Sequence, residues 1–496
     1  MTVLGNAPVV KLGLVGASRD CFPVELTRRR LAALAAEVSR LCPSAHVCPV
    51  IIENERDALA AAAELSSADC NAATVYLGNF GPEGPMAIFA QRFGGPVMFC
   101  AAAEENRAVL AAERGDALCG LLNCSYNLGL RRLRAHIPER PVGLPGELAP
   151  LVADFERVAR AVIGLRDLKI FGFGPRPQDF LACNAPVGPL FALGVEVMEN
   201  SELDLFRIYR AAASQTARIA ETVADMKREL GAGCTYPDLL PRLAQFEVAL
   251  LDFAKENLGS RRYAAFADKC WPAFESEFGF VPCYVNSRLA GRGIPVACEV
   301  DLYGALSEYL AQCASGGPAT LLDINNSVPA EILPAGADLG GAAPGELFMG
   351  FHCGNTASGC MKGCRLNYQV IMNRLMEGGG RPDITRGTLE GRLRPGPVTM
   401  FRLQSAADCR LGSYVAEGEV LDVDPCSFGS IGVFAVPGFA RFYRHVLVGR
   451  QFPHHAAVAF ARAGKTLFDA VRLLGVEEIA APLPAGTRYP GENPFG

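Results

Sequence analysis

Two acidic residues follow short apolar segments in the middle of the chain, where they could serve in acid–base or metal chemistry. Ile294–Cys298 precedes Glu299, and Ala319–Leu322 precedes Asp323. Between the two acids, apolar residues recur at three and four residues, as on one face of a helix. Strands joined by a helix normally lie parallel and adjacent, and α/β sheets bind ligands at the carboxyl ends of such strands. We therefore expect both carboxylates to lie side by side at one edge of a sheet.

Histidines are few, and four of the six lie in the last third of the chain. His454 and His455 are adjacent and follow a turn proline in the segment FPHHAAVAF, where His455 is predicted to open a helix that runs to Leu474. Two carboxylates with one or two imidazoles form a mixed oxygen and nitrogen site, which suits Mn²⁺, Mg²⁺ or Co²⁺ better than a thiolate-binding ion. These ligands form no local motif. The candidates are Glu299, Asp323, His455 and His352.

Eighteen cysteines are scattered along the chain, several of them inside apolar segments. Residues 1–14 lack the basic start and long apolar stretch of a signal peptide, so we expect reduced, mostly buried thiols in a cytoplasmic protein. Cys353, Cys360 and Cys364 lie close together and could bind zinc or an iron–sulfur cluster. Their spacing contains no paired CxxC and no obvious fourth ligand, which favours packed thiols instead.

The composition describes a well-packed globular protein with more than one domain. The chain has 496 residues, of which 50% are hydrophobic and 20% charged, and a single core rarely grows to this length. The net charge of −5 argues against a nucleic-acid-binding protein, because such proteins usually carry a basic surplus. No apolar segment is long enough to span a membrane.

The order of predicted strands and helices indicates two doubly wound α/β domains followed by a β-rich C-terminal domain. The first domain covers residues 1–165, where strands such as Val9–Val15 alternate with helices such as Val24–Leu41. Ala117–Leu122 is predicted as a further strand of this domain. The turn after the first strand lacks a dinucleotide fingerprint, so we predict no nicotinamide site. Arg19 in this turn is either a solvated residue or a substrate contact.

The second predicted domain, residues 166–340, begins with the strand Leu168–Phe173 and contains both acids. A connection rich in alanine, glycine and proline, Val328–Gly345, marks its end. The third domain, residues 341–496, is richer in glycine, proline and short β-like segments, and it carries the histidine pair. Three basic residues near the proposed site could bind an anionic group on a sugar, but solvated side chains are favoured. They are Lys362, Arg365 and Arg402.

Three segments of this chain resemble the L-fucose isomerase and L-arabinose isomerase superfamily. They read ACEVDLYGALSEYL, TLLDINN and FPHHAAVAFARAGKTLFDAVRLLG. In that family, an acid that closes one strand, a second acid that closes the next and a late histidine that opens a helix hold a catalytic Mn²⁺. By this resemblance Glu299 matches the first acid, Asp323 the second and His455 the histidine. An aspartate in the second position is closer to fucose isomerase.

The resemblance implies further contacts around the metal. Arabinose isomerases have a fourth ligand histidine after the second acid, and His352 either fills that role or contacts substrate, although its distance from Asp323 in sequence is longer than expected. Arg19 lies where fucose isomerases have an arginine that reaches the site of a neighbouring subunit. His454 and Asn355 are further candidates for substrate contacts.

The function implied by the resemblance is a metal-dependent aldose–ketose isomerase that acts on a free monosaccharide through a cis-enediol. A divalent cation, Mn²⁺ with Co²⁺ or Mg²⁺ as alternatives, stabilises the developing oxyanion, and Glu299 or Asp323 transfers the proton. The family implies a homo-trimer or homo-hexamer with sites shared between subunits. The alternatives are an isomerase or epimerase of a modified, for example anionic, sugar, a non-catalytic carbohydrate-binding protein, and a thiol-based metal or redox protein.

Overall fold

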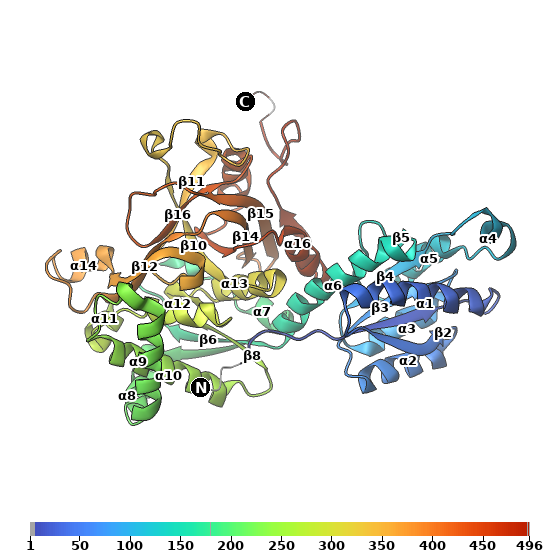
Figure 1. Ribbon diagram of the computed structural model, residues 1–496, viewed down its shortest axis with the longest axis horizontal. Coiled ribbons are helices and arrows are strands. Elements are labelled where there is room, and N and C mark those ends of the chain that lie inside the picture. Colours follow the sequence, from blue (N-terminus) through green and yellow to red (C-terminus); the bar gives the residue numbers. More distant parts are fainter. Residues whose placement is uncertain (1–4, 179, 494, 496) are drawn as a thin grey trace. The chain divides into compact units, whose positions relative to one another are not determined.

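The computed structural model describes residues 5–178, 180–493 and 495, and it divides into two compact units (Figure 1). The N-terminal unit comprises Pro8–Ile163 together with Asp469–Gly475, and the main unit comprises the remaining residues. The three-domain division remains a prediction. No helix among the described residues is both long and apolar enough to cross a membrane.

The N-terminal unit contains a five-stranded parallel sheet in the order β2-β1-β3-β4-β5. Residues in β1, β3 and β4 are buried throughout, as expected for strands with helices on both faces. This confirms the predicted doubly wound fold. The strands are β1 (Leu12–Ala17), β2 (His46–Ile52), β3 (Ala72–Leu77), β4 (Val97–Ala102) and β5 (Val142–Gly143), and the helices are α1 (Val24–Leu41), α2 (Glu55–Ser67), α3 (Glu83–Phe93), α4 (Arg107–Ala112), α5 (Ala117–Leu130) and α6 (Pro145–Arg166), whose last turn belongs to the main unit.

One predicted strand of this unit is wrong, because Ala117–Leu122 forms the first part of helix α5. The buried residues of α5 recur with helical spacing, at Ala117, Leu121, Cys124 and Leu128. Six apolar residues are too few to separate a period of two from a period of 3.6. The helical period becomes visible only over the full length of α5.

The main unit begins with a four-stranded parallel sheet in the order β7-β6-β8-β9. Helices α8 and α10 contact each other, and α8 packs on β6 and β7. The strands are β6 (Leu168–Gly174), β7 (Glu196–Ser201), β8 (Tyr263–Ala267) and β9 (Val296–Ala297), and the helices are α7 (Gly188–Ala192), α8 (Glu202–Ala212), α9 (Thr216–Leu230), α10 (Leu240–Asn257), α11 (Ala273–Phe278) and α12 (Cys283–Gly291).

The rest of the main unit is built on a nine-stranded mixed sheet in the order β12-β13-β16-β11-β10-β17-β14-β15-β18. A further pairing between β16 and β15 closes six of these strands into a ring. The predicted β-rich C-terminal region is confirmed. The strands are β10 (Ala319–Ser327), β11 (Leu347–His352), β12 (Met361–Tyr368), β13 (Arg386–Leu393), β14 (Gly396–Ser405), β15 (Leu411–Leu421), β16 (Ser430–Ala435), β17 (His455–Ala459) and β18 (Glu478–Ala480), with helices α14 (Val370–Met376), α15 (Phe439–Phe442) and α16 (Gly464–Leu473), whose second half, from Asp469, belongs to the N-terminal unit.

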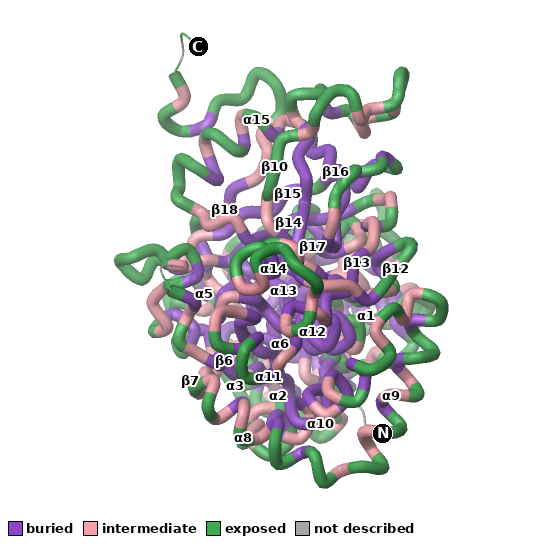
Figure 2. The backbone as a smooth tube through the Cα atoms, turned by 90° about the vertical axis from the view of Figure 1, so that its left-hand side faces the viewer, coloured by how far each residue is buried: buried purple, intermediate pink, exposed green. Residues whose placement is uncertain are grey.

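Helix α13 (Leu302–Ser315) lies between the two sheets of the main unit (Figure 1). It contacts β6, β8 and β9 on one side and β10, β14 and β17 on the other. Every residue from Leu302 to Ala314 is buried, and in Figure 2 the buried part of the chain runs through α12, α13 and β14. A helix that is covered on all sides joins the two sheets into one core.

This position of α13 corrects the predicted arrangement of the two acids. The strand before Glu299 is β9 of the parallel sheet, whereas Asp323 lies inside β10 of the mixed sheet, where β10 runs antiparallel to β11 and β17. The two strands are therefore not neighbours. A crossover helix that is exposed on one face returns the chain to the same sheet, but α13 is buried on both faces and leads into a second sheet.

The predicted helix from His455 to Leu474 is also wrong in its first half. His455 opens strand β17, and a helix, α16, begins only at Gly464. The apolar residues after His455 form a central strand that is buried throughout. A short apolar segment of this kind is compatible with either a buried strand or a buried helix.

Candidate metal centre

Three of the predicted ligands come together in the main unit. The Nε2 atom of His455 lies 3.2 Å from Oε2 of Glu299 and 3.4 Å from Oδ1 of Asp323. The pairing of β10 with β17 places Asp323 directly opposite His455. Glu299 reaches the same place from a short 3₁₀ turn, Cys298–Val300, that follows β9. Three segments far apart in the sequence thus converge on one point.

Two atoms at this point are buried without a hydrogen-bond partner in the described part of the chain. They are Nε2 of His455 and Oε2 of Glu299. Although these atoms are 3.2 Å apart, their geometry is not that of a hydrogen bond. A buried polar atom without a partner costs about 1–3 kcal/mol, and a cation between the two atoms would satisfy both.

The backbone that carries Glu299 adopts a rare conformation. Glu299 and Val300 have φ values of +53° and +55°, in the left-handed region that a β-branched residue such as valine seldom enters. Each such residue costs on the order of 1–3 kcal/mol, and strain of this kind is concentrated at functional sites. The fold therefore retains an unfavourable backbone at the residue that presents the first acid.

Asp301 and Arg402 form a buried charged chain behind His455. The Asp301 carboxylate lies 2.8 Å from Nδ1 of His455, and the Arg402 guanidinium donates two hydrogen bonds to the same carboxylate, at 2.6 and 2.9 Å. The side chains of His455 and Arg402 are 0% exposed and that of Asp301 1%. Asp301 also caps α13, because it accepts a hydrogen bond from the backbone N–H of Gly304.

The charges in this chain shift the ionisation of its members. Burial opposes ionisation of Asp301, but Arg402 and His455 hold the pKa of the Asp301 carboxyl well below its usual value. Burial also opposes protonation of His455, yet its neighbours Asp301, Cys183 and Glu299 raise the pKa of the imidazole well above its usual value. The site therefore attracts positive charge to the position that His455 faces.

His352 lies at the edge of the same centre. It ends β11, is 3% exposed, and its ring centroid lies 6.2 Å from that of His455. A ring nitrogen of His352, a carboxylate oxygen of Glu299 and the Cys298 thiol all lie within 4.8 Å of one another. Burial lowers the pKa of His352, so the imidazole is neutral at physiological pH.

Two further predicted contacts lie close to the ligands in sequence. His454 has its Nε2 atom 3.7 Å from Oδ1 of Asp323, and its ring centroid lies 4.2 Å from that of His455. Asn355 is 5% exposed, and its Oδ1 atom has no hydrogen-bond partner in the described part of the chain. The structure thus brings His454 to the centre, whereas for Asn355 it shows only an unsatisfied buried amide.

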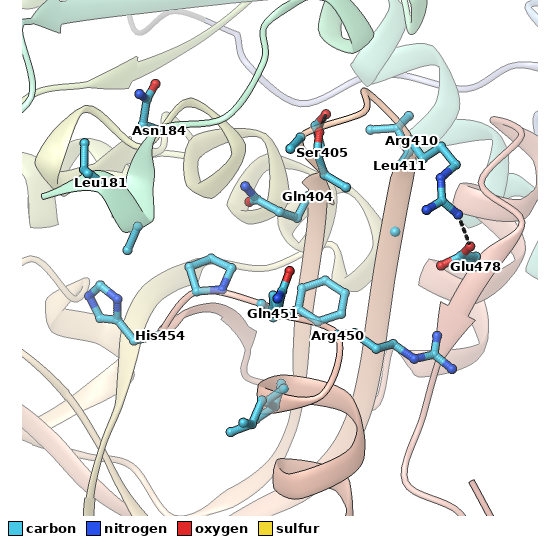
Figure 3. Close-up of a pocket in the computed structure, with 18 of the residues that line it drawn as sticks. Leu181, Asn184, Gln404, Ser405, Arg410, Leu411, Arg450, Gln451, His454 and Glu478 are labelled. Atoms are coloured by element: carbon cyan, nitrogen blue, oxygen red, sulfur yellow. Dashed lines mark hydrogen bonds and ion pairs between the residues drawn. The ribbon is translucent and has the colours of Figure 1, made fainter. Parts of the chain in front are cut away.

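A cavity of about 810 Å³ opens beside the centre and includes His454 in its wall (Figure 3). Its lining joins Gln404 of β14, Arg410, and Arg450 with Gln451 after a π-helical turn. Arg410 pairs with Asp408 and with Glu478, whereas no acidic side chain of the described chain lies within ion-pair distance of Arg450. Cavities of this size hold small molecules.

Of the three basic residues predicted to be solvated, Arg402 contradicts the prediction. Its side chain is fully buried, where it pairs with Asp301. Lys362 and Arg365 have side chains 50% and 60% exposed, and they lie near Asp422 and Glu390. Neither Lys362 nor Arg365 lines the cavity beside the centre.

The cysteines at 353, 360 and 364 belong to none of the groups of potential metal ligands found among the described residues. Cys353 accepts a hydrogen bond from Nε2 of Gln369 at 3.1 Å. Cys364 donates to the carbonyl of Ser358 at 3.6 Å. All eighteen cysteines of the chain are free thiols.

Arg19 belongs to the N-terminal unit and follows strand β1. In the strand order of that sheet, the direction of winding changes between β1 and β3, the usual place for a ligand in such folds. The backbone N–H of Arg19 donates to Asn79 at 2.9 Å, and its guanidinium lies 5.0 Å from the ring of Phe80. Its contact with the site of a neighbouring subunit remains a prediction.

Asp301 was not predicted as part of the site, and Arg402 was predicted only as a basic residue near it, although each left a signal in the sequence. Asp301 precedes an apolar helix, which is typical of an N-cap, and that local role hides its contact with His455. Arg402 stands inside the apolar strand segment TMFRLQ, and a charged residue in a buried strand needs a partner. Only the tertiary structure shows that this partner is Asp301.

Comparison with known proteins identifies the family. Residues 13–166 match the family model for the fucose/sulfoquinovose isomerase N-terminal domain, and residues 350–480 match the model for the L-fucose isomerase C-terminal domain. The chain belongs to the L-fucose isomerase-like superfamily. The second match includes His455 and His352, and both matches agree with the resemblance drawn from the segments around Glu299, Asp323 and His455.

Two curated relatives of this chain are both named sulfoquinovose isomerase. The chain is 24% identical over 331 residues to a sulfoquinovose isomerase of Priestia aryabhattai, an alignment that covers 64% of this chain and 66% of that protein. It is 26% identical over 337 residues to a sulfoquinovose isomerase of Alkalicoccus urumqiensis, covering 66% of this chain and 68% of the relative. The chain thus spans about two thirds of the length of these relatives.

Proposed function

We propose that this chain is a metal-dependent aldose–ketose isomerase that acts on a modified monosaccharide. The observation that carries the proposal is the pair of buried atoms without partners, Nε2 of His455 and Oε2 of Glu299, which face each other beside the Asp323 carboxylate. Membership of the L-fucose isomerase-like superfamily supports the reaction type.

The donor set fits a divalent cation of the Mn²⁺ type. Glu299, Asp323 and His455 offer carboxylate oxygens and one imidazole nitrogen, and this mixed set suits Mn²⁺, with Co²⁺ and Mg²⁺ as alternatives. When bound, the cation supplies a Lewis acid that stabilises negative charge on a substrate oxygen. Asp301 keeps the imidazole of His455 oriented, as carboxylates do behind many ligating histidines.

The two acids also suit proton transfer. Burial opposes ionisation of Glu299, but the neighbouring His455 and His352 lower its pKa, so this side chain is a carboxylate at neutral pH. Asp323 has a side chain 21% exposed, which leaves it open to the substrate. One of the two accepts the proton from C2 and returns it to C1, while the hydroxyl proton passes from the C2 oxygen to the C1 oxygen, through a cis-enediol.

The cavity and the relatives favour a modified sugar over the unmodified monosaccharide that we expected first. Two of the relatives are named sulfoquinovose isomerases, and we propose a substrate with an anionic substituent. The cavity beside His454 offers such a group the guanidinium of Arg450 (Figure 3). The metal centre next to the cavity and the cationic side chain in the cavity wall would hold the two ends of the sugar.

The test uses metal-free protein reconstituted with Mn²⁺, Co²⁺ or Mg²⁺ and assayed with aldoses that carry a sulfonate, a phosphate or no charge at C6. Ketose formation is followed by NMR in D₂O, where a proton transfer through an enediol introduces deuterium at C1 of the ketose. We expect turnover only with metal, and faster with the anionic sugars. If no sugar is converted, or conversion proceeds without metal, the proposal is wrong.

Variants of the acids identify their part in the reaction. Glu299→Gln and Asp323→Asn should each lower turnover by at least about 100-fold, the size expected for loss of an acid–base group. Asp422→Asn, a change in an exposed acid, serves as the matched control and should leave turnover unchanged. Near-normal turnover in either acid variant would remove that residue from the mechanism.

A further inference from the structure

His352 and His455 lie in the same centre but in different surroundings. His352 closes β11, which pairs with the strand that carries Asp323. One of its ring nitrogens lies within 4.8 Å of a Glu299 oxygen. His352 is therefore near enough to Glu299 to be considered as a further metal ligand, and its role depends on which ring nitrogen carries a proton.

Hydrogen bonds place the protons of the two imidazoles on different nitrogen atoms. Nδ1 of His455 lies 2.8 Å from the Asp301 carboxylate, which can only accept, so Nδ1 carries a proton. Nε2, which faces Glu299, is the atom that would bind a cation once its own proton has left. Nδ1 of His352 accepts a hydrogen bond from the backbone N–H of Cys353 at 2.9 Å. A nitrogen that accepts carries no proton, so the proton of neutral His352 is on Nε2.

We infer that His352 donates a hydrogen bond from Nε2 to a substrate oxygen and is not a metal ligand. A metal needs a free lone pair on nitrogen, and His352 has none, because its Nδ1 lone pair is used by the Cys353 amide and its Nε2 carries the proton. The inference rests on the proposed isomerase function and assigns a catalytic role to a residue of that site.

The reaction offers a place for such a donor. Negative charge develops on the carbonyl oxygen when the proton leaves the neighbouring carbon, and an N–H group in a buried site stabilises that charge without first having to reorient. Among the described residues, the ring of His352 has a single hydrogen bond, the one to the Cys353 amide. Nε2 is therefore free to donate to substrate, and the ring neither gains nor loses a proton.

The Cys298 thiol, the third member of this group, does not turn it into a second metal centre. Cys298 packs with Cys270 and Cys283 in a buried apolar cluster. Cys298 is thus part of the apolar core, and Glu299 and the His352 N–H are the polar members of this group.

The test compares three variants of the full-length enzyme, His352→Gln, His352→Asn and His455→Gln. Glutamine places an N–H donor near the position of Nε2 of His352, whereas asparagine places an acceptor near Nδ1, where it can keep the Cys353 hydrogen bond but offers no donor to substrate. Two readouts are measured: Mn²⁺ affinity by titration with electron paramagnetic resonance of the free ion, and kcat and KM for the converted sugar.

We expect both His352 variants to bind Mn²⁺ as tightly as the unchanged enzyme, and His455→Gln to bind at least about 100-fold more weakly. His352→Asn should lower kcat by about 100-fold, and His352→Gln by clearly less. A loss of Mn²⁺ affinity in both His352 variants comparable to that of His455→Gln would overturn the inference, as would an unchanged kcat in His352→Asn. Circular dichroism checks that each variant is folded.

The same measurements separate this inference from the proposed function. If the unchanged enzyme converts no sugar, the proposed function fails, while the Mn²⁺ affinities still decide whether His352 is a ligand. If the unchanged enzyme is active and His352→Asn matches it in kcat, the isomerase proposal stands and the donor role of His352 is wrong.

Discussion

The imidazole of His455 is constrained at both of its nitrogen atoms. On one side the Asp301 carboxylate accepts from Nδ1, and on the other Nε2 faces Glu299 and Asp323. Arg402 in turn holds Asp301 with two hydrogen bonds. The ring position of this ligand and the proton on its Nδ1 are already fixed, so little side-chain conformational entropy is lost when a cation binds.

The first prediction concerns Asp301. Asp301→Asn removes the charge that fixes the Nδ1–H tautomer of His455, and the amide can instead donate to Nδ1. We expect Mn²⁺ affinity to fall by about 10- to 100-fold, the size found for partners behind metal ligands. Titration with Mn²⁺ measures it, with Asp422→Asn as the control. Unchanged affinity would show that Asp301 has no influence on the ligand.

The second prediction concerns the far end of the cavity. Arg450→Gln should raise KM for a C6-anionic sugar by about 10-fold, because one charge-assisted hydrogen bond is worth roughly 1.5–3 kcal/mol, and should leave KM for an uncharged sugar unchanged. Arg444→Gln is the matched control, since Arg444 is an exposed arginine of the π-helical turn that precedes Arg450 and does not line the cavity. An equal rise for both sugars would remove Arg450 from anion recognition.

At the scale of elements, α13 determines how the site is assembled. Its N-cap, Asp301, contacts His455, and its two sides contact the strands that carry the other ligands. The helix is buried throughout, so its polar residues have no access to water. Glu308 is one of them, 2% exposed, with Oε2 lacking a partner in the described structure.

The third prediction is the pH dependence that Glu308 produces. Burial raises the pKa of Glu308 from 4.5 to about 8, so the folded state binds this proton more tightly than the unfolded state. The stability from Glu308 is complete below pH 4.5 and is lost as the pH rises towards 8, at a slope of at most about 1.4 kcal/mol per pH unit.

Glu308→Gln removes this dependence, because the amide does not titrate. Urea unfolding of both proteins between pH 5 and 8 should therefore show a free energy of unfolding that falls less steeply with pH in the variant. Glu256→Gln, a change in an exposed glutamate of α10, is the control and should follow the unchanged protein. Parallel pH profiles for Glu308→Gln and the unchanged protein would show that Glu308 is not protonated in the folded state.

At the scale of the whole molecule, the main unit alone contributes all the described contacts of the metal centre. The family resemblance nevertheless predicts a homo-trimer or homo-hexamer whose sites include a residue of a neighbouring subunit, for which Arg19 is the candidate. The contribution of the N-terminal unit to the site of another copy therefore depends on how the subunits assemble.

The fourth prediction follows from this question. Light scattering of the purified protein should give a mass three or six times 52.8 kDa, the mass of one chain. Arg19→Ala should raise KM for the sugar in the assembled protein while Mn²⁺ affinity stays unchanged, because Arg19 is expected to contact substrate and not metal. A protein of 52.8 kDa in solution that is fully active would contradict the shared site.

Several features of this protein could be predicted from the sequence. The apolar pattern predicted α1 with its observed ends, and the alternation of strands and helices predicted a doubly wound N-terminal fold and a β-rich C-terminal region. The metal centre at Glu299, Asp323 and His455 was predicted from the resemblance of their segments to a known family rather than from residue types alone, and it remains a prediction. Such features are local, because periodicity, turn residues and the chemistry of single side chains are properties of neighbouring residues.

The tertiary structure decided the rest. Each acid lies in a different sheet because α13 is buried on both faces and connects the two sheets. A short apolar segment does not reveal such burial, nor does it show whether His455 begins a strand or a helix. The partners of Asp301 and Arg402 come from segments far away in the chain. Hydrogen bonds of this kind form only after distant strands have paired, so no local pattern encodes them.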